Sequence, residues 1–173
     1  MKKNILFAFV MVLMTLPVFS QKYAYIDSEY ILGNVPEYKE AQAELDRIAA
    51  LWQKEIEAKF KTIDSMYKSY QVEAITLPDN LKKNREDQII AAEQDAKNLQ
   101  KRRFGKDGDL FKKREELVKP IQDKVFAAIE EYSKEKGYAF VFDVSGAMTI
   151  VYADEKFDIN DAILEKLGIT PTK

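Results

Sequence analysis

The sequence contains neither cysteine nor histidine. Without cysteine there are no disulfides, thiolate metal sites or thiol catalysis, and no lipid-modified cysteine behind an export signal. Without histidine the chain lacks the commonest general base and the commonest ligand of transition metals. An enzyme would need a nucleophile with an oriented base, and no such pair is present, so we predict no catalytic residues.

Long apolar runs are also absent after the first twenty residues. Lys2 and Lys3 precede an apolar stretch from Ile5 to Val18, and small residues stand three and one before a cleavage point after Ser20. The stretch of about 14 residues is shorter than the roughly 20 of a membrane-spanning helix. We therefore predict a signal peptide at residues 1–20 rather than a permanent anchor, and a mature chain that begins at about Gln21.

Acidic side chains outnumber basic ones. The chain has 27 Lys and Arg against 29 Asp and Glu, and signal removal takes only Lys2 and Lys3, so the mature net charge is about −4. This balance argues against nucleic-acid binding. The acidic clusters lack the spacing of calcium loops, so we predict no metal and no cofactor. These clusters are Glu115 with Glu116, and Asp154, Glu155 and Asp158.

Three short strands are predicted at the two ends of the mature chain. Lys22–Asp27 is rich in aromatic and β-branched residues. Tyr138–Val144 and Met148–Ala153 flank residues 145–147, which read as a hairpin turn around Gly146. A short last helix should end at Leu167, with Asp158 or Asn160 as its cap and Gly168 in the left-handed closing position.

The middle of the chain predicts two long helices. Residues 38–136 contain proline only at Pro78 and Pro120 and are rich in helix-forming residues. Pro78 disfavours a helix before it, and Asp79 or Asn80 can cap a new one, so the tip falls at residues 76–80. We expect a rising helix of about 40 residues and one descending helix, Leu81–Lys136, of about 55. Pro120 implies a kink or a helix start.

Apolar residues three and four apart along these helices predict a coiled-coil seam. On the rising helix they are Tyr38, Ala41, Leu45, Ile48, Trp52, Ile56, Phe60, Ile63, Tyr67, Tyr70 and Ala74, and on the descending helix Val118, Ile121, Val125, Ala128 and Tyr132. Between Ala91 and Asp109 this seam is thin, and Gly105 and Gly108 weaken the helix further, which predicts a flexible middle. Trp52 is expected in the core.

Two long helices with a narrow apolar stripe bury little surface, and three short strands have open edges. We therefore predict an α+β oligomer, with a β-rich hub from residues 21–36 and 119–173 and helical hairpins from residues 37–118. Six side chains are expected to bury in the hub. They are Tyr25, Ile26, Phe140, Phe142, Ile150 and Tyr152.

Several segments, arranged in a fixed order around the long coiled coil, resemble the Skp/OmpH family, and the resemblance covers essentially the whole mature chain. They are Tyr25-Ile26-Asp27-Ser28 with Tyr30-Ile31-Leu32, residues 119–125, residues 137–143 with Ser145-Gly146, residues 150–154, and residues 158–164 with Leu167-Gly168. The resemblance implies a homotrimer with a β-barrel-like body and three helical tentacles around a cavity. It also implies a periplasmic holdase for unfolded outer-membrane β-barrel proteins, without nucleotide or metal and with at most peripheral membrane contact. The best-known members are strongly basic, whereas this mature chain is mildly acidic.

Two regions are candidates for client binding. Residues 97–114 are strongly basic, and this stretch either is a solvated helix face neutralised by glutamates or lines the cavity, with Lys97, Lys101, Arg102 and Arg103 as contacts. The tip is more apolar than solvent exposure requires, which reflects either hairpin packing or adaptable contacts with clients. The tip residues are Met66, Tyr67, Tyr70, Val72, Ile75 and Leu77. The alternative function is a structural coiled-coil spacer or scaffold of the cell envelope.

Overall fold

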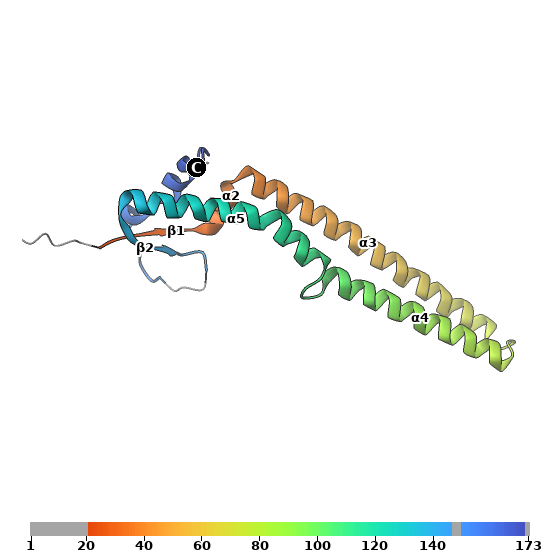
Figure 1. Cartoon of the computed structure of the whole chain (residues 1–173). Coiled ribbons are helices and arrows are strands. Elements are labelled where there is room, and N and C mark those ends of the chain that lie inside the picture. The colour runs from red at the N-terminus through yellow and green to blue at the C-terminus, as the bar shows by residue number, and fades with distance from the viewer. Residues whose placement is uncertain (1–20, 147–149, 172–173) are drawn as a thin grey trace, which may run out of the picture.

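The computed structural model describes residues 21–146 and 150–171. The predicted signal peptide and residues 147–149 of the predicted hairpin lie outside these ranges. The described chain is elongated: a body that contains both ends carries one long arm of antiparallel helices (Figure 1). The expected α+β architecture with a long helical hairpin is confirmed.

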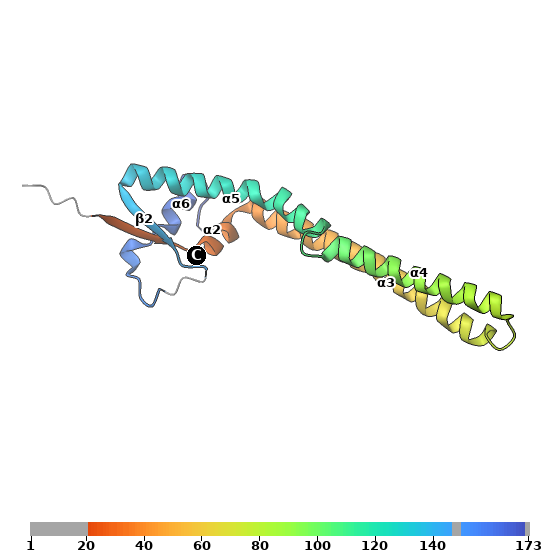
Figure 2. The ribbon, with the colours of Figure 1, turned by 60° about the horizontal axis from the view of Figure 1, so that its bottom comes forward.

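The arm rises through helix α3, Pro36–Glu73, and returns through α4, Asp79–Phe104 (Figure 2). Proline at the first position suits α3, because its missing N–H would have no partner within the helix. The predicted break at residues 76–80 is confirmed. The predicted cap is wrong, since α4 begins at Asp79 itself, behind Pro78 in an extended conformation and without a side-chain cap.

The descending helix is broken into two, so the prediction of one helix from Leu81 to Lys136 is wrong. Helix α4 ends at Phe104, and α5 runs from Asp109 to Lys136. A Cβ at Gly105 would lie 2.3 Å from the carbonyl oxygen of Lys101, and one at Gly108 would lie 2.7 Å from that of Arg102. The backbone therefore folds back on itself so closely that only glycine fits. Pro120 lies inside α5, so a helix start there is also wrong.

The core of the arm is thin and discontinuous. Near the body Ala41, Leu45 and Val118 form one buried cluster, and near the tip Ile63, Ile89 and Ala96 form another. Two helices cover only one narrow stripe of each other. Ile56 and Leu99 are buried as well, and Val125 and Ala128 of the predicted seam are buried in the body, whereas the other seam residues remain at least partly accessible.

The body contains a two-stranded parallel sheet of β1, Lys22–Ile26, and β2, Tyr138–Asp143. The strands are parallel because the arm, a long crossover, returns the chain to the beginning of β1. Lys22 pairs with Tyr138 but Tyr23 with Phe140, so Ala139 is an extra residue in β2. Ala24 and Ile26 are buried on one face of the sheet, and Tyr23 lies with Phe140 on the other.

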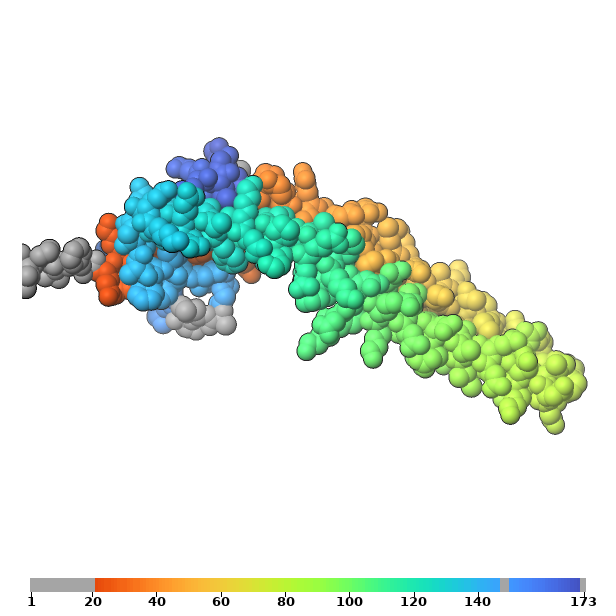
Figure 3. All heavy atoms as spheres, in the orientation of Figure 1, coloured from red at the N-terminus to blue at the C-terminus, as the bar shows by residue number. Residues whose placement is uncertain are grey.

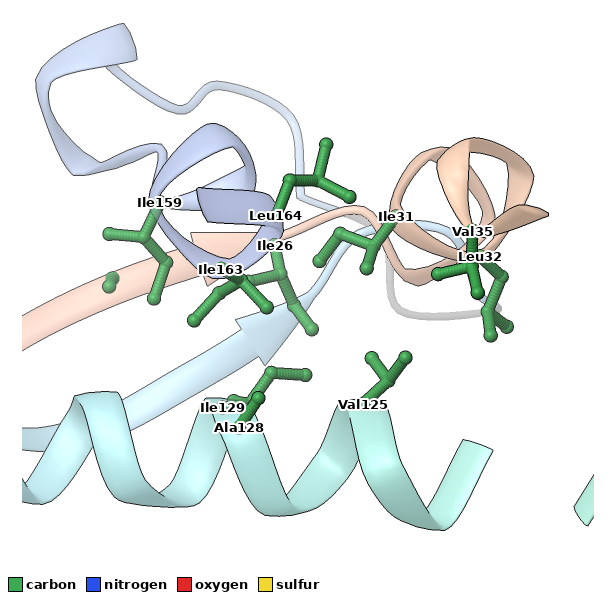
Figure 4. Close-up of a cluster of buried hydrophobic side chains, with 11 residues drawn as sticks. Ile26, Ile31, Leu32, Val35, Val125, Ala128, Ile129, Ile159, Ile163 and Leu164 are labelled. Atoms are coloured by element: carbon green, nitrogen blue, oxygen red, sulfur yellow. The ribbon is translucent and has the colours of Figure 1, made fainter. Parts of the chain in front are cut away.

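Three helices cover the buried face: α2, Ser28–Asn34, the inner part of α5, and α6, Asn160–Lys166. Side chains from all three converge with Ile26 in one cluster (Figure 4). Its most deeply buried large members are Ile31, Ile163, Leu164 and Val125. A single turn of 3-10 helix, Glu155–Phe157, leads into α6. Gly168 has φ +77°, which confirms the left-handed end of the last helix.

Of the two predicted caps of this helix, Asp158 accepts a hydrogen bond from the backbone N–H of Asn160 (2.7 Å), although Ile159 occupies the cap position. Asn160 is itself the first helical residue. Its amide oxygen accepts instead from the backbone N–H of Asp27 (2.7 Å), which ties α6 to the end of β1.

The third predicted strand is wrong over the part that the structure describes. Residues 150–153 are not in a strand, and Val151 and Tyr152 are 93% and 81% exposed. Aromatic and β-branched residues favour a strand only where a neighbouring strand and a packing surface are available. Among the described residues, no strand pairs with this segment.

Candidate functional site

The end of the arm exposes large apolar side chains. Val72 and Ile75 are 78% and 87% exposed, and Tyr67 is 41% exposed. The other three predicted tip residues, Met66, Tyr70 and Leu77, are half-buried. Hairpin packing accounts for Met66 and Tyr70, which contact the outer cluster of the arm, but it does not account for Val72 and Ile75. The tip thus combines packed residues with a free apolar surface.

Hydrogen bonds and one ion pair join the two helices near the tip. The Tyr67 hydroxyl donates to Glu93 (2.9 Å) and the Tyr70 hydroxyl to Glu86, and each hydrogen bond raises the pKa of its tyrosine. Arg85 pairs with Glu73 at 3.4 Å. These links hold α3 and α4 at a fixed separation over the last turns of the arm.

A groove of about 270 Å³ lies between the two helices just below the tip. Met66, Tyr70 and Ile89 supply its apolar lining, and Thr62, Ser65 and Ser69 supply small hydroxyl side chains. The remaining lining comes from the ion-paired Glu73 and Arg85. In the space-filling view the outer arm that carries this groove is a slender rod (Figure 3).

The basic stretch surrounds the break between α4 and α5. Lys101, Arg102 and Lys106 are exposed, and together with Lys112 they line a hollow of about 440 Å³ beside the turn. Within the described residues none of these four cations forms an ion pair, whereas Lys97 pairs with Glu93 at 3.7 Å. Glu93 lies on α4 itself, and among the described ion pairs of this stretch only that of Arg103 with Glu55 involves a glutamate of the rising helix.

Arg103 differs from its neighbours because it is packed between helices. Its side chain is 26% exposed and lies over Trp52, with ion pairs to Glu55 (3.5 Å) and Asp109 (2.7 Å). Trp52 is half-buried and also meets the ring of Phe104 edge-on at 6.4 Å. This cluster fixes the break in the descending helix.

The outer face of the body sheet carries stacked aromatic rings. The centre of the Tyr23 ring lies 6.0 Å from that of Phe140 and 6.4 Å from that of Phe142, and the ring planes are nearly parallel. Phe140 is 56% exposed. Of the predicted hub residues, Ile26 is buried in the chain itself, Tyr25, Phe142 and Ile150 are half-buried, and Phe140 and Tyr152 are exposed.

A hollow of about 550 Å³ continues this aromatic face. Its apolar lining comes from both strands and from the segment after residue 149. The lining includes Tyr23, Tyr25, Phe142, Ile150, Tyr152 and Phe157. Such a large apolar surface on one side of a two-stranded sheet is typical of a surface that another chain covers.

A polar cluster holds the two strands to the start of α2. One carboxylate oxygen of Asp143 accepts hydrogen bonds from the backbone N–H groups of Ser28 (3.1 Å) and Ser145 (3.0 Å) and from the Ser145 hydroxyl (2.8 Å). Partial burial opposes ionisation, but these hydrogen bonds outweigh it and hold the pKa of Asp143 below its usual value. The cluster lies away from the aromatic face and has a structural role.

Within residues 21–146 and 150–171, no group of acidic side chains is arranged to hold a metal ion, and no helix has the length and hydropathy needed to cross a bilayer. Neither finding adds a function to the sites described above.

Two features were missed from the sequence. Tyr23 belongs to the aromatic face, and its position two residues before Tyr25 in a strand was the available signal. The groove was also missed, although Thr62, Ser65 and Ser69 follow one another at helical spacing on α3. Small polar residues at that spacing are common on solvated helices, so this signal alone is weak.

Three comparisons place the chain among known proteins. The profile of the family described as Outer membrane protein (OmpH-like) matches residues 22–167. A curated protein of Aquifex aeolicus (strain VF5), described only as uncharacterized, is 29% identical over 149 residues, which cover 86% of this chain and 87% of that protein. The crystal structure of an OmpH-like candidate outer membrane chaperone from Caulobacter crescentus CB15 superimposes with a TM-score of 0.68 at 14% identity, over 92% of each chain.

The structural match shows a shared fold, and the profile match extends from β1 to the end of α6. It therefore includes the sheet, the whole arm and the last helix. The resemblance inferred from the sequence is confirmed, and this chain belongs to the OmpH-like family of outer membrane proteins.

Proposed function

We propose that this protein is a periplasmic holdase chaperone. It binds unfolded outer-membrane β-barrel proteins between helical arms and prevents their aggregation without ATP. The observation that carries the proposal is the exposed apolar tip, where Val72 and Ile75 lie on a slender arm that has no need of them for packing. Family membership and the fold shared with a candidate outer membrane chaperone support the same function.

The arms are proposed to project from a trimeric body. Tyr25, Phe140, Phe142, Ile150 and Tyr152 would become buried where the aromatic faces of three copies meet, whereas Ile26 is already buried on the other face of the sheet within each chain. Two strands alone form a marginal sheet, and burial of several aromatic side chains at about 1.5–3 kcal/mol each would offset the cost of association. Residues 1–20 are proposed to direct export to the periplasm and to be removed there.

Client contacts are proposed at two levels of the arm. At the tip, Val72 and Ile75 give weak apolar contacts that release easily, with Met66, Tyr67, Tyr70 and Leu77 beside them. Further down, Lys97, Lys101 and Arg102 attract acidic client segments, while Arg103 keeps the arm in shape. Methionine and aromatic surfaces accept many partners, which suits a chaperone with diverse clients.

The proposal is tested with the mature chain, residues 21–173, and an outer-membrane porin diluted from urea. Light scattering should fall to the level of soluble porin at about one trimer per client. A double variant, Val72→Ser and Ile75→Ser, should protect less while its far-ultraviolet circular dichroism stays unchanged. Normal aggregation in the presence of the wild-type chain would contradict the holdase and favour the structural spacer.

A matched control separates client contact from packing. Ile63→Ser removes a side chain of similar size from the buried outer cluster, where only 5% of Ile63 is exposed. This control should lower helicity and thermal stability together with protection. Equal loss of helicity in the double variant would mean that its two residues serve packing.

A further inference from the structure

We propose that the groove below the tip binds a single aromatic side chain of the unfolded client. This inference rests on the proposed function and adds a defined pocket to it. The groove lies between α3 and α4, and Met66, Tyr70, Ile89, Ser65 and Ser69 are among the residues that line it.

The size of the groove suits one ring. Its volume is about 270 Å³. A cavity of about 150 Å³ with apolar walls is sufficient to bind benzene. A six-membered or fused ring therefore fits with its attachment to a peptide backbone, whereas a packed helix or strand does not.

The lining selects an apolar ligand. The hydroxyls of Thr62 and Ser65 donate to carbonyl oxygens of their own helix, those of Ala58 and Lys61, each at 3.0 Å. Glu73 and Arg85 neutralise each other at 3.4 Å. The groove thus presents little unsatisfied polarity, and a charged or strongly polar side chain would lose hydration there without compensation.

The apolar groups favour an aromatic ring over an aliphatic chain. A methionine sulfur gains about 0.3–1.5 kcal/mol from contact with a ring, and the ring of Tyr70 offers an offset or edge-on partner. Met66 and Tyr70 both line the groove, and both contact the outer cluster, which anchors them. The strands of outer-membrane barrels carry aromatic residues in two girdles, so the proposed clients supply this ligand repeatedly.

The groove also lies close to the exposed tip, because Val72 is within one helical turn of the groove-lining Ser69, Tyr70 and Glu73 on α3. An extended client segment that lies across Val72 therefore passes the mouth of the groove. The occupant to which this geometry points is a tyrosine, phenylalanine or tryptophan side chain of that segment.

The two methionines of the mature chain, Met66 and Met148, allow a direct test. Methyl groups labelled with ¹³C at methionine would give two signals, one from the groove and one as an internal reference. The probe is a short peptide that alternates tyrosine with serine and ends in lysines; its matched partner carries leucine for tyrosine. The tyrosine peptide should move the Met66 signal upfield in a saturable manner through the ring current, and leave Met148 in place.

A pair of variants links the signal to the groove. Ser69→Phe places a ring in the groove from an exposed position, whereas Gln71→Phe places the same ring at an exposed position outside it. The first variant should weaken tyrosine-peptide binding by about tenfold, and the second should leave it unchanged. Thermal melts of both variants establish that each is folded.

Three results would overturn the inference. The leucine peptide could shift the Met66 methyl signal as far as the tyrosine peptide does, or the tyrosine peptide could leave that signal unshifted. The signal could also shift when the chain is concentrated without peptide, which would show a second copy in the groove. Porin aggregation measured on the same samples separates this failure from a wider one. If protection persists while Met66 does not respond, the groove assignment fails and the holdase stands; if protection is absent, both fail.

Discussion

The guanidinium of Arg103 lies 4.6 Å from the centre of the Trp52 ring and joins the end of α4 to α3. The same side chain donates to Asp109 at the beginning of α5 (2.7 Å) and pairs with Glu55 of α3 (3.5 Å). One residue thus connects all three long helices at the point where the descending helix is broken. We infer that Arg103 sets the course of the arm at this break.

Replacement of Arg103 by alanine should lower the free energy of unfolding by about 1–2 kcal/mol, because a cation–π contact and two ion pairs are lost together. Arg103→Lys should recover little of this stability, since lysine lacks the planar guanidinium that bonds two carboxylates and stacks on a ring. Urea denaturation at fixed protein concentration, followed by the fluorescence of the only tryptophan, measures both. The neighbouring exposed Arg102→Ala should cost less than about 0.5 kcal/mol. Equal losses for the two alanine variants would rule out the connecting role of Arg103.

Two glycine-to-alanine changes should have opposite signs. Gly33 lies in α2 with nothing within 4 Å of an added Cβ, so Gly33→Ala should stabilise by up to about 1 kcal/mol through helix propensity. At Gly105 the added Cβ would lie 2.3 Å from a backbone oxygen, and Gly105→Ala should destabilise by about 1–3 kcal/mol. Thermal and urea unfolding check both. Stabilisation by Gly105→Ala would mean that the turn converts to continuous helix without penalty.

Some of this architecture follows from sequence spacing and some does not. Ala41 and Leu45 lie on the predicted seam and are buried, because a spacing of three and four places them on one helix face. At residues 105–108 the sequence predicts only a weakened helix, because glycine lowers helix propensity. The turn itself depends on two contacts of Arg103, one with Trp52, which is distant in the sequence, and one with Asp109 on the other side of the break. Local propensity does not contain such contacts.

The body shows the same limit. The strand sequences of β1 and β2 are recognisable, yet residues 150–153 of the third predicted strand pair with no strand in the described part of the chain. Tyr25 and Ile26 were both assigned to the hub, although neighbouring strand residues point to opposite faces. Ile26 accordingly packs inside the chain, and Tyr25 belongs with the aromatic surface.

Acid should weaken the body through Asp143. Its folded pKa lies below the usual 3.8, because hydrogen bonds from Ser28 and Ser145 outweigh partial burial. The stabilisation from the charged carboxylate is therefore present above about pH 4 and is lost as pH falls through the lower folded pKa. Asp143→Asn should cost about 1–3 kcal/mol at pH 7, and less as the pH approaches 3. Urea denaturation from pH 7 to pH 3 measures the difference, and a pH-independent difference would contradict this account.

Reversal of the free cations beside the break should weaken client binding. The double variant Lys101→Glu and Arg102→Glu should bind unfolded porin several-fold more weakly at low salt, and the deficit should shrink by 0.5 M salt as the Debye length falls below about 8 Å. Fluorescence anisotropy of labelled porin provides the affinities. The control reverses two exposed cations elsewhere on the arm, Lys61 and Lys83. An identical deficit in the control would assign the effect to net charge alone.

The mass of the mature chain in dilute solution tests the central claim most directly, namely that the aromatic face of the body is shared with sister copies that hold the arms apart. Light scattering coupled to size exclusion should give three times the mass of one chain, with a hydrodynamic radius too large for a compact particle. Phe140→Lys should reduce the mass towards that of a single chain. A stable, compact monomer of the wild-type chain, with Phe140 and Tyr152 open to solvent, would contradict the account.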